Sequence, residues 1–201
     1  MILHRLSLIN YRNIAAADLE FSPKINCLIG RNGEGKTNVL DAIYYMSFCH
    51  SATSMLDALT VRHGEDYMVA VGGYEDEDGR KYEVSCGVKQ HKSKKFSLNK
   101  KAYKRLAEHI GLVPLVMVSP NDGELVTGGG EARRKFMDIV ISQYDRLYLD
   151  SLIKYNRALK QRNALLRGDA EPDASMLDIY EEEMAAEGEK IFMARAVLTE
   201  K

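Results

Sequence analysis

The chain has 201 residues, of which 45% are hydrophobic, 28% charged and 8% aromatic, and its formal net charge is −1. These values are typical of a soluble globular protein and exclude the collagen-like, disulfide-scaffold and disordered classes. No apolar run approaches the roughly 18 residues that a membrane span needs, so we expect a cytoplasmic protein with no membrane partner. The three cysteines form no CxxC pair, which argues against a disulfide framework and a structural zinc site.

The first third of the chain predicts a hairpin, a buried strand and a helix. Apolar and polar residues alternate in residues 2–9 and 17–21, on either side of a polar turn at residues 10–13, and this predicts an antiparallel pair of strands. The short apolar run at residues 25–29 predicts a buried central strand. Apolar residues then recur at helical spacing in residues 39–47, which predicts an amphipathic helix.

The middle of the chain predicts a second hairpin followed by a basic block. Residues 67–75 and 81–88 have the pattern of two strands. Residues 89–105 then carry eight basic side chains and no acidic one, and Tyr103 is the only aromatic residue there beside Phe96. A solvated hairpin face explains such a block, and so does a surface that tracks a nucleic-acid backbone; composition leaves both alternatives open.

The last third of the chain predicts helices. Long helical patterns cover residues 131–167, with a possible break near residues 143–145, and residues 174–200. A turn near residues 167–169 joins them, so we expect an antiparallel pair. The apolar stripes expected to face each other are Leu149, Leu152, Ile153, Tyr155, Leu159, Leu165 and Leu166 on one helix, and Met176, Ile179, Tyr180, Met184, Ile191 and Phe192 on the other.

One motif carries chemistry. It reads Gly30, Arg31, Asn32, Gly33, Glu34, Gly35, Lys36 and Thr37, and it satisfies the phosphate-binding pattern G-x-x-x-x-G-K-[ST] in full. A chance match in a chain of this length has odds of about one in a hundred. The predicted strand before the motif and the predicted helix after it are the context in which this pattern is a P-loop rather than a glycine-rich turn.

Each residue type in the motif has a chemical reason. The glycines permit the backbone angles that turn successive N–H groups inward, so that a triphosphate can lie in that nest at the positive end of a helix. Lys36 supplies a mobile positive charge for the β- and γ-phosphates, and the Thr37 hydroxyl suits a coordination position on Mg²⁺. The sequence therefore predicts ATP and Mg²⁺ as cofactors and residues 30–37 as their binding site, with Thr37 as the metal ligand.

Several blocks resemble one group of ATPases. Two amphipathic strands precede the loop, whereas metabolite kinases usually open with the strand that feeds it. That order, together with residues 10–14 and 29–43, resembles the ABC-type ATPases that act on chromosomes, the SMC and Rad-type group. Within that group the chain looks most like the RecF family of bacterial recombinational repair proteins. The further blocks that look like that family's are residues 61–64, 118–120, 129–138 and 155–166.

The resemblance implies an α/β fold in which a P-loop ABC-type ATPase lobe with a mixed sheet carries an inserted antiparallel helical arm. Residues 1–125 would form the nucleotide-binding lobe, incomplete in this chain, and residues 131–201 would form a truncated arm. Arg12 would reach the nucleotide phosphates, the alternative being an exposed loop arginine. The family's function would be DNA replication and repair in the DNA-damage (SOS) response: an ATP-dependent homodimer binds single-stranded and duplex DNA at gap junctions and helps load recombinase with RecR- and RecO-type mediators.

The sequence also departs from the family. A complete ATPase of this type needs an apolar strand that ends in a carboxylate pair, the Walker B motif, and a serine–glycine signature loop, and we find neither. We therefore expect an N-terminal part of a weak DNA-dependent ATPase, inactive alone, with no catalytic residue of its own. Residues 50–54 also contain no arginine where the family usually has one. The alternatives are a small-molecule P-loop kinase and a folded fragment that binds nothing tightly.

Overall fold

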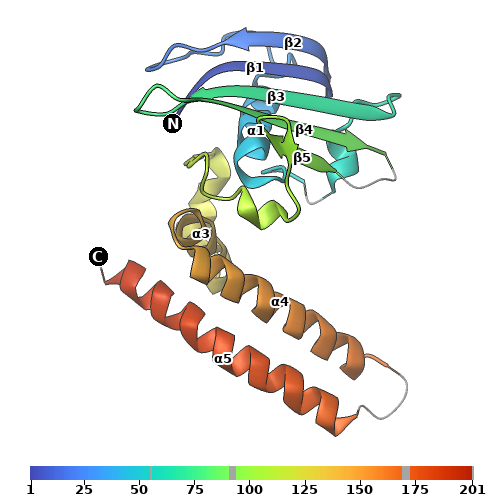
Figure 1. Cartoon of the computed structure of the whole chain (residues 1–201), viewed down its shortest axis with the longest axis vertical. Coiled ribbons are helices and arrows are strands. Elements are labelled where there is room, and N and C mark those ends of the chain that lie inside the picture. Colours follow the sequence, from blue (N-terminus) through green and yellow to red (C-terminus); the bar gives the residue numbers. More distant parts are fainter. Residues whose placement is uncertain (55, 91–93, 169–172, 201) are drawn as a thin grey trace. The chain divides into compact units, whose positions relative to one another are not determined.

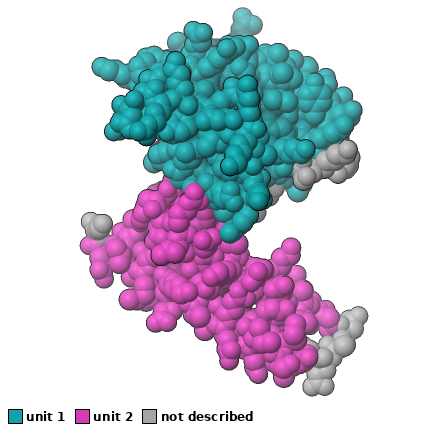
Figure 2. Space-filling model, in the orientation of Figure 1, with its two compact units in different colours: residues 1–117 teal, residues 118–201 magenta. Residues whose placement is uncertain are grey.

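The computed structural model describes residues 1–54, 56–90, 94–168 and 173–200. The chain divides into two compact units, Met1–Met117 and Val118–Lys201, which Figure 2 colours separately. Among the described residues, no helix is both long enough and apolar enough to cross a membrane.

The first unit is built on a six-stranded sheet, which Figure 1 shows with α1 (Lys36–Phe48) against one of its faces. The strand order is β2-β1-β3-β4-β5-β6, and every neighbouring pair is antiparallel. The strands are β1 (Ile2–Tyr11), β2 (Ile14–Glu20), β3 (Tyr67–Glu75), β4 (Lys81–Lys89), β5 (Lys95–Leu98) and β6 (Lys101–Ala102), and the short 3-10 helices are η1 (Asp57–Thr60) and η2 (Leu106–Glu108). Both predicted hairpins are confirmed, as β1 with β2 and as β3 with β4.

Alternation along the strands places the core on the face that α1 covers. Successive side chains of a strand point to opposite faces, so alternate residues are buried along β3, at Val84, Cys86 and Val88 of β4, and at Leu6 and Leu8 of β1. The buried side chains of the sheet and of α1 include Leu6, Leu8, Met68, Ala70, Val84, Cys86, Val88, Phe96, Val39, Ala42, Tyr45 and Met46. Burying a side chain of leucine or phenylalanine size contributes about 1.5–3 kcal/mol, so this layer holds α1 and the loop before it in place.

The predicted buried strand at residues 25–29 is wrong. These residues form no strand, and the side chains of Ile25 and Ile29 are 83% and 92% exposed. An apolar run becomes a buried strand only where neighbouring strands accept its backbone hydrogen bonds, and no described strand pairs with this one. The α/β class is confirmed. The sheet of the described residues, however, is antiparallel throughout and not mixed, and residues 25–29 add no strand to it.

A buried histidine lies beneath the sheet, after η2. His109 is 0% exposed; its Nε2 lies 2.6 Å from the Met46 carbonyl oxygen and its Nδ1 lies 3.2 Å from the Tyr103 hydroxyl. The ring also contacts the Phe96 ring, with centroids 5.5 Å apart. Burial lowers the pKa of His109, because the charged imidazolium loses its hydration there.

This burial predicts a pH dependence of stability. Because the folded-state pKa of His109 is below that of the unfolded chain, near 6.5, the unfolded chain binds the extra proton as the pH falls. The His109 contribution is therefore complete above about pH 6.5 and declines below it. We expect the urea midpoint of the parent to fall more between about pH 7.5 and pH 5.5 than that of His109→Gln, whose amide keeps a donor for Met46. Equal slopes in the two proteins would contradict the assignment.

The second unit consists of helices. They are the 3-10 helix η3 (Pro120–Gly123) and α2 (Glu124–Thr127), α3 (Gly130–Tyr144), α4 (Arg146–Leu166) and α5 (Ala174–Thr199). The predicted break near residues 143–145 is confirmed, since Asp145 ends α3 and caps α4, with its carboxylate accepting a hydrogen bond from Tyr148 N at 3.0 Å. Helices α4 and α5 run antiparallel, as predicted (Figure 1). Of the turn predicted near residues 167–169, residue 169 lies outside the described part.

The apolar contact between α4 and α5 is narrower than predicted. Ile191 is buried, and Leu152 and Tyr155 pack against the cluster that it forms with Ile141 and Tyr148. Ile179 and Phe192, however, are 57% and 68% exposed. Two helices can bury only one narrow stripe between them, and charged pairs line the rest of this contact. These pairs are Arg157 with Glu183 at 2.9 Å, Arg162 with Glu181 at 2.8 Å, and Lys154 with Glu187 at 3.4 Å.

Candidate nucleotide-binding site

The motif forms a loop that leads directly into α1. Gly33 and Gly35 have φ angles of +86° and +100°, a left-handed conformation that side-chain-bearing residues rarely adopt. Gly35 is the residue immediately before α1, so the loop ends at the positive end of a helix of 13 residues. The helix predicted after the loop is confirmed. Arg31, Asn32, Gly33, Glu34 and Thr37 are exposed.

Lys36 folds back over the loop. Its Nζ donates hydrogen bonds to the carbonyl oxygens of Gly30, at 2.8 Å, and Arg31, at 2.7 Å. The ammonium group therefore lies at the mouth of the loop, where a phosphate oxygen can replace either carbonyl as its acceptor. Thr37 is exposed in the first turn of α1, next to this lysine.

The loop already donates a backbone N–H group to an anionic oxygen. Arg31 N donates to Glu34 Oε2 at 2.8 Å. A Cβ atom at Gly30 would lie 2.3 Å from that same oxygen, so the space beside Gly30 is available only because this residue has no side chain. The Arg31 N–H group and the Lys36 ammonium group are donors that fit phosphate, and the glycine backbone leaves space for it.

Arg12 belongs to the turn between β1 and β2. Its Nε donates to Asp41 Oδ2 at 2.9 Å, and its Nη2 donates to the hydroxyls of Ser51, at 2.8 Å, and Thr53, at 2.7 Å. The Arg12 side chain is 20% exposed. The Arg12 guanidinium thus binds both α1 and the segment that follows this helix. In residues 50–54, where the family usually has an arginine, this chain contributes the Ser51 and Thr53 hydroxyls instead.

Sequence reasoning missed the buried acid that anchors this group. Asp41 is 1% exposed and accepts hydrogen bonds from the Tyr11 hydroxyl at 2.8 Å and from Ala52 N at 2.8 Å, besides the bonds from Arg12 and Ser51. Burial, and then the Asp41 carboxylate, raise the pKa of Tyr11 far above its usual value. An acidic residue among the apolar positions of the predicted helix was the signal that could have found it.

Sequence reasoning also missed two asparagines beside the loop. Asn13 Nδ2 donates to the Gly33 carbonyl oxygen at 2.6 Å, and Asn38 Nδ2 donates to Asn13 Oδ1 at 2.6 Å. Both residues lie within the sequence blocks that carry the family resemblance, but nothing in their spacing indicated that they meet.

The basic block is only partly at the surface. Its two aromatic residues do not interleave with the lysines at the surface, because Phe96 is 1% exposed and Tyr103 packs against the core cluster. Lys94 binds inward, to Asp57 at 2.9 Å and to the Cys49 carbonyl oxygen at 2.5 Å. Residues 91–93 of the block lie outside the described part. Its exposed lysines are Lys89, Lys95, Lys100, Lys101 and Lys104.

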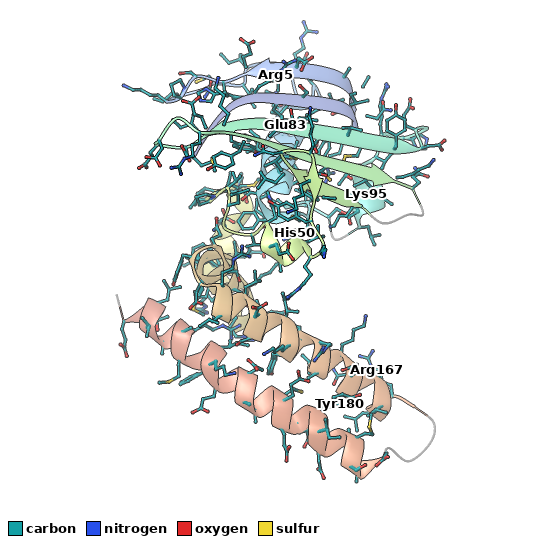
Figure 3. The ribbon with its side chains drawn as sticks, viewed as in Figure 1. Arg5, His50, Glu83, Lys95, Arg167 and Tyr180 are labelled. Carbon is teal, nitrogen blue, oxygen red and sulfur yellow. The ribbon has the colours of Figure 1, made fainter. Side chains whose placement is uncertain are left out.

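An exposed aromatic residue comes instead from β3. Tyr67 is 47% exposed and is paired across the strands with Lys89. With Val69, Gly87 and Lys95, these residues line an open hollow of about 400 Å³ on the sheet. Figure 3 shows Lys95 on β5. A tyrosine ring beside two lysines is a combination that suits a nucleic-acid strand.

Comparisons with known proteins agree with this geometry. A family model described as the RecF/RecN/SMC N terminal domain matches residues 2–198. The DNA replication and repair protein RecF of Phocaeicola vulgatus is 55% identical over 196 residues, which are 98% of this chain and 53% of that protein. The protein of the same name from Bacteroides thetaiotaomicron is 49% identical over 200 residues, which are 100% of this chain and 54% of that protein.

A solved structure, described as the recombination mediator protein RecF-ATP in the RecFOR pathway, is also similar. Its TM-score is 0.91 and its sequence identity 30%, and the match covers 99% of this chain and 54% of that one. The chain thus spans about half the length of the curated relatives it matches. Because the family model covers almost the whole sequence, the chain belongs to the RecF/RecN/SMC N-terminal domain family.

Proposed function

We propose that this chain is the ATP-binding part of a DNA replication and repair protein. The observation that carries the proposal is the loop of residues 30–37, which places glycine backbone and the Lys36 ammonium at the start of α1. The names of the relatives and of the ATP-bound structure support the same assignment. Family membership weighs against the small-molecule kinase. Titration of the chain with Mg·ATP, with Lys36→Ala as the matched variant, tests the proposal.

The chain's own residues account for binding in three ways. Lys36 exchanges the Gly30 and Arg31 carbonyl oxygens for phosphate oxygens as acceptors, and the loop N–H groups donate hydrogen bonds to the anion at the start of the helix. The Thr37 hydroxyl would hold Mg²⁺, which when bound neutralises phosphate charge. The Glu34 carboxylate must leave Arg31 N, because two anions cannot share that donor. We also propose that Arg12 contacts phosphate, which requires its hydrogen bonds to the Ser51 and Thr53 hydroxyls to be replaced by bonds to phosphate oxygens.

The activity of the whole protein is part of the proposal. Phosphoryl transfer depends on positioned groups on both sides of the γ-phosphate, and residues 30–37 supply one side. We therefore expect weak nucleotide binding and essentially no turnover by the chain alone. For the longer protein we propose an ATP-gated, cytoplasmic dimer that is a weak DNA-dependent ATPase. This dimer would act on DNA at gaps, together with RecO- and RecR-type mediators. Residues 1–125 would belong to its nucleotide-binding lobe and residues 131–201 to its helical arm.

We propose that Lys89 and Lys95, the lysines that line the hollow beside Tyr67, contact DNA. The double variant Lys89→Gln/Lys95→Gln should bind short single-stranded DNA more weakly, because each lost phosphate contact reduces the counterions released on binding. The slope of log K against log salt should fall by about one to two units. Fluorescence anisotropy over a salt series measures it.

Lys81→Gln is the matched control, since Lys81 lies on the same strand at its other end. It should leave the slope within about half a unit of the parent's. The surface is refuted if the double variant and Lys81→Gln show the same slope.

A further inference from the structure

The turn between β1 and β2 lies against the P-loop through one side chain. The Asn13 amide donates through Nδ2 to the Gly33 carbonyl oxygen at 2.6 Å, and its Oδ1 accepts from Asn38 Nδ2 at 2.6 Å. Asn38 is in the first turn of α1. A single amide therefore bridges the middle of the loop and the start of the helix that follows it.

The contact continues at the next glycine of the loop. A Cβ atom at Gly35 would lie 3.0 Å from Asn13 Oδ1 and 3.2 Å from Ile14 Cγ1, which is closer than ordinary packing allows. Gly35 is buried and has a φ angle of +100°. The loop backbone thus passes close to the turn, and both the short contacts and the positive φ favour a glycine at this position.

The turn is itself held firmly. Arg12 N donates to the Thr60 carbonyl oxygen at 2.8 Å, and the Arg12 side chain binds the buried Asp41 at 2.9 Å. On the other side of the turn, Arg62 N donates to the Asn10 carbonyl oxygen at 2.8 Å. Asn13 therefore projects toward the loop from a support that is fixed to the core.

From these contacts we propose that Asn13 is a positioning residue for nucleotide binding. In an anion nest the N–H groups face the ligand, so the carbonyls must point elsewhere and need other partners. Asn13 supplies that partner for Gly33 and so holds the segment from Gly33 to Gly35, with its two left-handed glycines, ready for phosphate. Glycines have little conformational preference of their own, and a loop ordered in advance loses less entropy on binding.

The proposal rests on the proposed function, the binding of a nucleoside triphosphate at residues 30–37. Asn13 acts through the Gly33 carbonyl group and is not itself a phosphate-binding residue. Its effect should therefore be seen in the affinity for nucleotide and in the order of the loop, and not in the stability of the sheet.

The test uses the 201-residue chain and its Asn13→Ala variant. Calorimetric titration with Mg·ATP should show about threefold to tenfold weaker binding by the variant, the loss expected for one hydrogen bond. Without nucleotide, the amides of residues 33–35 should exchange hydrogen faster in the variant, while the β1 and β3 amides and the melting temperature stay at the parent values. Asn38→Ala should change the same quantities less, and the double variant should be no weaker than Asn13→Ala.

Asn10→Gly is the matched control. Asn10 lies near the end of β1, just before the turn, and has a φ angle of +53°, which glycine tolerates, but its amide binds Glu65 at 3.2 Å and not the loop. This variant should keep the parent's affinity and its exchange at residues 33–35.

Each outcome decides one question. Equal affinity of the parent and Asn13→Ala overturns the positioning role. If the parent itself does not bind Mg·ATP, the proposed function fails. Separately, unchanged hydrogen exchange at residues 33–35 in Asn13→Ala would overturn the inference that Asn13 orders the loop. If Asn13→Ala does not fold, Asn38→Ala decides, because parent-like affinity and exchange in that variant contradict the bridge.

Discussion

Replacing Asp41 with alanine is expected to lower the free energy of unfolding of the first unit by about 3–5 kcal/mol. The carboxylate is 1% exposed and accepts from Tyr11, Arg12, Ser51 and the Ala52 backbone. Its removal leaves the partly buried Arg12 Nε and the buried Tyr11 hydroxyl without an acceptor, which costs more than the loss of the pair itself. Urea denaturation followed by circular dichroism measures the change.

Asp18→Ala is the matched control for Asp41. Asp18 also pairs with an arginine, Arg5, at 3.0 Å, but both side chains are more than half exposed. Water screens such a pair, so the urea midpoint of this variant should stay near that of the parent. If the two variants have the same midpoint, Asp41 does not anchor α1 to the turn before β2.

Replacing Lys36 with alanine should weaken Mg·ATP binding by about tenfold to a hundredfold. The variant loses a charge-assisted hydrogen bond to phosphate, worth about 1.5–3 kcal/mol. Stability should not change, because the described partners of the ammonium are two loop carbonyl oxygens, those of Gly30 and Arg31. Thr37→Ala should mainly reduce the dependence of ATP binding on Mg²⁺.

Lys24→Ala, a change in the exposed segment before the loop, is the control for charge alone. It should bind Mg·ATP as the parent does. Parent-like affinity in Lys36→Ala would refute the role given to this lysine.

The sequence predicted the local elements well, because each has a strong local signal. Alternation in residues 2–9 predicted β1, and the motif followed by apolar residues at helical spacing predicted the loop and α1. The break between α3 and α4 was also predicted, and Asp145 makes it by capping α4. Such features depend on neighbours in the sequence and need no knowledge of the tertiary fold.

The errors and omissions all depend on contacts between distant segments. Whether residues 25–29 form a strand depends on a pairing partner, which periodicity does not contain. Asp41 and Arg12 are 29 residues apart, and Asn13 and Gly33 are 20 apart. Likewise, Phe96 on β5 is buried in the core. The exposed aromatic ring beside Lys89 and Lys95 is that of Tyr67, which comes from the more distant strand β3.

The most direct test of nucleotide binding is hydrogen exchange of the parent chain during a titration with Mg·ATP. Saturable protection should appear at residues 30–38, the loop and the first turn of α1, and Lys36→Ala should need much more nucleotide to reach it. Protection should not extend through β3 and β4. The absence of saturable protection at these residues up to about 1 mM Mg·ATP, or equal protection in Lys36→Ala, would contradict the assignment of this loop as the nucleotide site.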